Sequence, residues 1–104
     1  MKMEFVFDKS KLEESGYTEE QCLNIIRNYF KSYNSDTIKE IAKGIFEGSE
    51  SDWNAFASTA RFPYTNWFLK VIKEWYWYND EGDGKGEQKG DCLKAYYKVA
   101  ALKV

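Results

Sequence analysis

Residues 64–79 read YTNWFLKVIKEWYWYN and contain three of the four tryptophans of the chain. They follow Pro63, the only proline. Apolar residues recur here at spacings of three and four, which is the pattern of an amphipathic helix. Because proline suits a first helical turn and disfavours helical geometry in the residue before it, the helix is predicted to begin at or just after Pro63. Its predicted buried face consists of Tyr64, Trp67, Phe68, Val71, Ile72, Trp75, Tyr78 and Asn79.

Trp77 falls on the opposite, polar side of that predicted helix. A single exposed apolar residue needs no explanation, and the indole could lie on the stem of Lys73 as a cation–π contact of about 0.5 to 1 kcal/mol. Alternatively, Trp77 is an anchor for a partner, because tryptophan and tyrosine lead binding hot spots. The sequence therefore predicts a partner-binding surface made of Trp77, Tyr76, Lys73, Lys70 and Leu69.

The length of 104 residues predicts a single domain, spanning 1–104. The formal net charge of -2 provides no general basic field for a polyanion. Aromatic residues comprise 7 Phe, 8 Tyr and 4 Trp, so rings are expected to dominate the tertiary contacts.

The first ten residues lack the apolar run of a secretory signal, and no stretch approaches the length of a membrane span. We therefore expect a cytoplasmic protein with no membrane association, in which Cys22 and Cys92 are free thiols. Histidine is absent, which removes the commonest general base and zinc ligand. The sequence predicts no catalytic residues, no metal site and no cofactor.

The N-terminal residues Met3, Phe5 and Phe7 alternate with polar or smaller residues, which favours a short strand. The strand could pair with the C-terminal residues, pair across a dimer, or lie on the helices as an extended arm. We favour the arm, because a two-stranded sheet is marginal. Asp8 then caps a short helix that Gly16 ends.

Three further helices are predicted in the middle of the chain. Thr18 and Gln21 form a capping box for the first, which extends to about residue 33. The second is capped at residue 35 or 36 and stopped by Gly48, and the third covers 51–63.

The sequence EGSES, residues 47–51, joins the second and third of these helices and raises the possibility of a helix-turn-helix motif. The helix over 51–63, however, has Glu50 just before it and Asp52 in its first turn, and its one basic residue, Arg61, lies at the far end. Because a recognition helix must approach phosphates, an ordinary helical hairpin is favoured.

Residues 80–90, DEGDGKGEQKG, hold four of the seven glycines and are predicted to form a flexible loop before the last helix. A calcium loop would need a bidentate Glu where Gly90 stands. A phosphate loop would need Ser or Thr after Lys85.

The last helix is predicted to begin near Asp91 and to be apolar on two sides. A helix of this kind either lies between layers or gives its second side to another chain. The weaker of the two apolar sides consists of Cys92, Ala95, Val99 and Leu102. It predicts self-association into a homodimer through these residues.

The sequence thus predicts an all-α fold, a compact bundle of about five helices with a short extended, possibly β, N-terminal arm. The function favoured is a small non-catalytic protein-binding module, an accessory or inhibitory protein that acts on a larger macromolecule. The alternative is a nucleic-acid-associated helical domain that uses the lysines and aromatic residues of the C-terminal half. An enzyme is the least favoured class, and no motif identifies a family.

Overall fold

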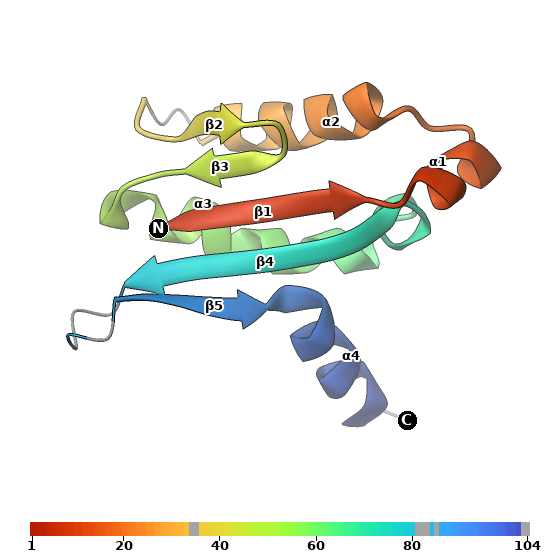
Figure 1. Ribbon diagram of the computed structural model, residues 1–104. Coiled ribbons are helices and arrows are strands. Elements are labelled where there is room, and N and C mark those ends of the chain that lie inside the picture. Colours follow the sequence, from red (N-terminus) through yellow and green to blue (C-terminus); the bar gives the residue numbers. More distant parts are fainter. Residues whose placement is uncertain (34–35, 81–83, 85, 103–104) are drawn as a thin grey trace.

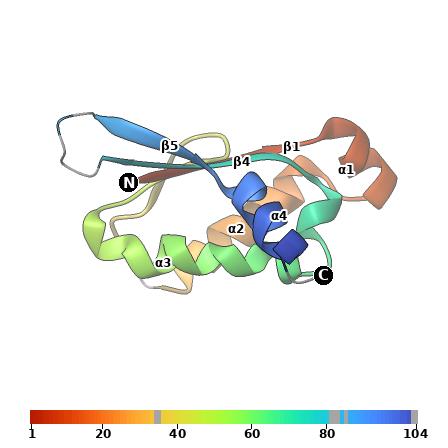
Figure 2. The ribbon, with the colours of Figure 1, turned by 90° about the horizontal axis from the view of Figure 1, so that it is seen from below.

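The computed structural model describes residues 1–33, 36–80, 84 and 86–102, without the side chains of Asp80 and Leu102. It is a two-layer α/β fold, in which a five-stranded antiparallel sheet has α2, α3 and α4 on one side (Figures 1 and 2). The strand order is β2-β3-β1-β4-β5. The prediction of an all-α helical bundle is therefore wrong.

The strands are β1 (Lys2–Phe7), β2 (Lys39–Ala42), β3 (Ile45–Glu47), β4 (Ile72–Asp80) and β5 (Glu87–Asp91). The α-helices are α1 (Lys9–Ser15), α2 (Glu19–Lys31), α3 (Trp53–Ala57) and α4 (Cys92–Leu102). Three 3₁₀ segments complete the order, η1 (Glu50–Asp52), η2 (Ser58–Tyr64) and η3 (Phe68–Lys70).

Strand β1 is the centre of the sheet rather than an arm. It pairs with β3 on one side and with β4 on the other, both antiparallel. Met3, Phe5 and Phe7 are buried and the residues between them are half-buried, as the alternation in the sequence predicts. The strand is confirmed, but its interpretation as an extended arm is wrong, because β3 and β4 pair with it on its two sides. Both of these strands come from segments that were predicted to be helical.

The helix predicted over residues 64–79 is wrong, because the segment contains η3 followed by strand β4. A bulge in β4 gives part of this segment a helical spacing of buried residues. Val6 pairs with Glu74 and Phe7 pairs with Ile72, which leaves Lys73 as an extra residue on β4. Ile72 and Trp75 are consequently both buried although they are three residues apart. A spacing of three is typical of a helix, but here it results from the extra residue of the bulge.

A tight β2–β3 hairpin replaces the helix predicted to end at Gly48. Ala42 pairs with Ile45 across a two-residue turn that ends in Gly44. Gly44 has a φ of 79°, and a Cβ at this position would lie 2.5 Å from the backbone oxygen of Phe5. Since the N–H of Phe5 also donates to the carbonyl of Gly44 at 2.8 Å, the turn lies directly against β1.

The predicted capping signals are confirmed at two helices. The Asp8 side chain accepts from the N–H of Lys11 at the start of α1, and Gly16 ends that helix in the left-handed conformation. At α2, the side chains of Thr18 and Gln21 form a reciprocal capping box. Local hydrogen bonds of this kind need no tertiary partner, so the sequence alone predicts them.

The remaining helix predictions are confirmed only in part. Residues 51–63 are helical, but mostly in the 3₁₀ form, and strand β3 precedes them, so both the helix-turn-helix motif and the helical hairpin are wrong. Helix α4 is present where predicted. Of the predicted loop 80–90, residues 87–90 belong to β5, while residues 81–83 and 85 lie outside the described part of the chain.

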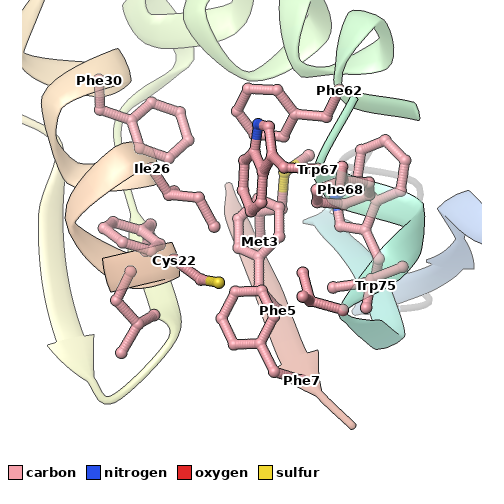
Figure 3. Packing of buried hydrophobic residues seen from close by; sticks show 14 of the residues in the cluster. Met3, Phe5, Phe7, Cys22, Ile26, Phe30, Phe62, Trp67, Phe68 and Trp75 are labelled. Carbon is pink, nitrogen blue, oxygen red and sulfur yellow. The ribbon is translucent and has the colours of Figure 1, made fainter. Parts of the chain in front are cut away.

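The core between sheet and helices is built from rings. Phe5 lies at its middle, near Phe62, Phe68 and Trp75 (Figure 3). The ring centroid of Phe5 is 6.0 to 6.2 Å from those of Phe46, Phe62, Phe68 and Trp75. Aromatic pairs at this separation add to the stability that burial alone provides. The sheet is therefore covered on its helical side by an aromatic-rich layer, to which aliphatic side chains such as Leu23 and Ile26 also belong.

Candidate functional site

A cavity of about 400 Å³ lies at the end of this aromatic layer, beside α4. Strands β1 and β4 contribute Met3, Trp75 and Trp77 to its lining. The α3–η2 segment, residues 53–64, contributes Trp53, Phe56, Ala57, Thr59, Ala60 and Tyr64. Helix α4 contributes Cys92, Ala95, Tyr96 and Val99. We call this cavity the apolar groove.

Edge-to-face ring contacts hold the sides of the apolar groove in place. The ring centroids of Trp53 and Trp77 are 5.6 Å apart with planes at 81°, and those of Phe56 and Trp77 are 5.6 Å apart at 68°. Tyr64 of η2 and Tyr96 of α4 meet at 5.5 Å and 85°. Trp53 and Tyr64 nevertheless remain 53% and 65% exposed, so apolar surface is open to solvent.

Helix α4 is positioned by the strand that precedes it. Asp91, the last residue of β5, pairs with Tyr76 of β4 and accepts a hydrogen bond from the N–H of Lys94 at 2.9 Å. This carboxylate caps α4 and fixes the start of the helix at the sheet edge. Ala95 and Val99, four residues apart on α4, line the apolar groove and remain exposed.

The lining of the apolar groove is uncharged at every residue that the structure describes. The Thr59 hydroxyl donates to the carbonyl oxygen of Phe56 at 2.6 Å, so its proton is already used. Burial raises the pKa of the Cys92 thiol to about 12, with a smaller contribution from Asp91. The thiol is therefore protonated at neutral pH and is a poor nucleophile.

The predicted partner-binding residues do not share one surface. Trp77 is half-buried in the apolar groove against Trp53 and Phe56, whereas Tyr76 points to the other face of the sheet, because successive strand residues alternate. On that face, Lys89 Nζ lies 3.8 Å from the Tyr76 ring centroid.

The other three members of that prediction are also dispersed. Lys70 is exposed at the end of η3, Lys73 is the exposed bulge residue of β4, and Leu69 is half-buried against the core. The indole of Trp77 has two aromatic neighbours in place of the predicted contact with Lys73. A strand carries residues four apart much farther from one another than a helix does.

Most of the residues predicted for self-association belong to the apolar groove. Cys92, Ala95 and Val99 line the apolar groove, and the side chain of Leu102 lies outside the described residues. Trp53, Tyr64 and Tyr96 were not among the predicted binding residues, and Tyr64 was assigned to the buried face of the predicted helix over residues 64–79. Apolar periodicity could not have distinguished them, because it marks which side of a helix is apolar and not whether that side is fully covered.

The described residues were also searched for a metal site and for a membrane-spanning helix. They contain no group of three or more Cys, Asp or Glu side chains that could hold a metal ion. None of the helices within the described ranges is long and apolar enough to cross a membrane.

Comparison with protein-family models, with curated proteins and with solved structures found no match for this chain.

Proposed function

We propose that this protein is a small non-catalytic protein-binding module, an accessory or inhibitory protein whose binding surface is the apolar groove. The supporting observation is the exposure of large aromatic side chains at a concave apolar site: Trp53 and Tyr64 border a cavity of about 400 Å³. Tryptophan and tyrosine in this setting are typical of the energetic centre of a protein interface.

The chemistry of the groove supports binding rather than catalysis. Its described lining residues include no carboxylate, amine or guanidinium, and the Cys92 thiol is kept protonated. General acid–base and nucleophilic catalysis both need a group that can gain or lose a proton near neutral pH. Two unpaired thiols, Cys22 and Cys92, suit a partner in the cytoplasm, where thiols stay reduced.

A protein partner is favoured over nucleic acid by the distribution of charge. On the face of the sheet away from the helices, Lys2 forms an ion pair with Glu87 at 3.1 Å, and Lys89 lies over the ring of Tyr76. The hydroxyls of Tyr76 and Tyr78 donate to Glu74 and Glu4, so carboxylates stand beside the aromatic rings. Such a face repels phosphates where stacking would be required.

Affinity capture with a matched pair of variants tests the proposal. Ala95→Glu places a charge in the apolar groove, while Ala101→Glu places the same charge on the opposite side of α4. We expect wild type and Ala101→Glu to capture the same protein from nuclease-treated lysate, and Ala95→Glu to lose at least tenfold of it. Circular dichroism checks that both variants remain folded.

Three results would refute the proposal. The first is capture that Ala95→Glu leaves unchanged, which would place the partner elsewhere. The second is capture that depends on intact nucleic acid, which would favour the nucleic-acid-associated alternative. The third is the recovery of no protein at all.

A further inference from the structure

Two tyrosines of β4 hold an ammonium of this chain on the face of the sheet away from the apolar groove. Lys89 Nζ lies 3.8 Å from the ring centroid of Tyr76 and 5.8 Å from that of Tyr78. The two rings are neighbours, with centroids 6.5 Å apart and planes at 58°. A second ammonium, that of Lys2, lies 5.0 Å from the Tyr78 centroid. The rings therefore suit a cationic ligand, because the face of an aromatic ring attracts positive charge.

A carboxylate stands at the hydroxyl end of each ring. The Tyr76 hydroxyl donates to Glu74 at 3.0 Å, and the Tyr78 hydroxyl donates to Glu4 at 2.8 Å. Neither carboxylate forms an ion pair with any residue that the structure describes, and this includes Lys73, the bulge residue beside Glu74. We call the two rings and these two carboxylates the tyrosine surface.

The register of the sheet separates lysines from carboxylates on this face. Tyr78 lies in a row with Lys2 and Lys89, its partners on the two neighbouring strands. In the next row, the partners of Tyr76 are the carboxylate residues Glu4 and Asp91. Lys89 nevertheless places its ammonium closer to Tyr76 than to Tyr78. The ammonium thus lies toward the row of carboxylates rather than within its own row, as expected for a surface that attracts cations.

A guanidinium fits this arrangement better than the ammonium of Lys89 does. The ammonium contacts a ring but forms no ion pair with a described carboxylate. A guanidinium is planar and can stack on a ring, while its fork of N–H groups donates to a carboxylate. Each ring of the tyrosine surface has a carboxylate at its hydroxyl end, so an arginine side chain can use both interactions at once.

The positions of the carboxylates favour a protein segment as the source of the arginine. Glu4 belongs to β1 and Glu74 to β4, so a segment with more than one arginine can pair with both, whereas a cation with a single charge cannot. Nucleic acid is disfavoured, because the same carboxylates repel phosphates.

From these observations we infer that the tyrosine surface binds an arginine-bearing segment of a partner protein, whose guanidinium groups stack on the two rings and pair with the two carboxylates. In the free protein, the ammonium of Lys89 holds the place of one guanidinium and is displaced on binding. This inference goes beyond the proposed function, since the apolar groove is lined by the opposite face of β4.

Defined peptides test the inference without knowledge of the partner. The probes are the hexapeptide Gly-Arg-Gly-Arg-Gly-Arg, its counterparts with Lys or Gln in place of Arg, and spermidine as a free amine. Each is titrated at low salt into the isotope-labelled full chain, and amide chemical shifts are followed. We expect the arginine peptide to give saturable shifts in β1, β4 and β5 and to bind about threefold more tightly than the lysine peptide or spermidine. The glutamine peptide should give no saturable shift.

Charge-neutralising variants locate the binding. Glu4→Gln and Glu74→Gln should each weaken the arginine peptide about fivefold, whereas Glu50→Gln, which removes the same charge from an exposed position in η1, should change its affinity by less than about twofold. Lys89→Gln should tighten binding about two- to fivefold, because the competing ammonium is gone. Lys39→Gln, which removes the same charge from β2 at the other edge of the sheet, should have a smaller effect. Amide spectra of the free variants check that each is folded, and Glu74→Gln carries the test if Glu4→Gln disturbs β1.

Several results would overturn the inference. One is arginine-peptide binding that Glu4→Gln and Glu74→Gln weaken no more than Glu50→Gln does, because binding would then follow net charge alone. Equal binding of the glutamine peptide would remove the role of charge, and equal binding of the lysine peptide would remove the choice of arginine. Spermidine that binds as tightly as the arginine peptide would assign the surface to a small amine. An affinity that Lys89→Gln leaves unchanged would show that Lys89 does not occupy the site.

Discussion

The substitution Gly44→Ala distinguishes the observed fold from a helical one by the sign of its effect. In a helix over residues 36–48, replacing this glycine with alanine would stabilise the protein by about 0.5 to 1 kcal/mol. In the β2–β3 turn, the left-handed backbone at a φ of 79° costs a non-glycine residue about 1 to 2 kcal/mol. The added Cβ would also lie 2.5 Å from the backbone oxygen of Phe5, and relieving such overpacking typically costs about 1 to 3 kcal/mol.

We therefore expect Gly44→Ala to lower the free energy of unfolding by about 2 to 5 kcal/mol. Urea denaturation followed by circular dichroism measures the change, with the slope m compared between variants. Gly16→Ala is the matched control, because Gly16 has a φ of 77° and nothing within 4 Å of the added Cβ. It should show only the backbone cost of about 1 to 2 kcal/mol. Equal losses for the two variants, or a stabilised Gly44→Ala, would refute the close approach of the turn to β1.

Three further expectations concern charge, thiol chemistry and the groove. A hydrogen bond from the Arg27 guanidinium lowers the pKa of Glu40. The stability that the ionised Glu40 provides is therefore present above about pH 4.5 and is lost as the pH falls through the lowered pKa. In Glu40→Gln, the free energy of unfolding should fall less steeply with acid, and an unchanged pH profile would contradict this. The Cys92 thiol, with its pKa raised to about 12, should react with a maleimide at pH 8 far more slowly in the folded protein than in urea, and equal rates would show an accessible thiolate. Trp53→Ala should change the unfolding free energy by about 1 kcal/mol or less and abolish partner capture, whereas Phe56→Ala, fully buried, should cost about 3 to 5 kcal/mol; comparable losses of stability would mean that Trp53 belongs to the core.

The ion-pair cluster on α2 shows why part of the fold was inaccessible to sequence analysis. Arg27 bonds Glu20 of its own helix through Nη1 and bonds Glu40 of β2 through Nε at 2.6 Å. The carboxylate of Glu40 in turn accepts from the N–H of Gly44 at 3.0 Å. The pair with Glu20 joins residues seven apart, two turns along the same helix. The link to Glu40, in contrast, exists only because the β2–β3 hairpin lies beside α2.

What the sequence determined by itself is local. The cap at Asp8, the stop at Gly16 and the capping box of Thr18 depend on neighbours within a few residues, and each is present in the structure. The alternation of β1 is equally readable, because its two faces have different surroundings. The composition also indicated an aromatic core, in which Phe5 is surrounded by other rings.

Tertiary structure decided the rest, as residues 64–79 and 36–48 show. In residues 64–79, the bulge at Lys73 places Ile72 and Trp75 on one face at a helical spacing. In residues 36–48, a chain that is apolar at helical intervals turns at Gly44 because β1 supplies the hydrogen-bond partner for that turn. Pairing with a distant strand outweighs a local preference for helix, since it satisfies the backbone and buries the rings together. The apolar groove depends on the same packing, because α4 and the α3–η2 segment line it together with residues of β1 and β4.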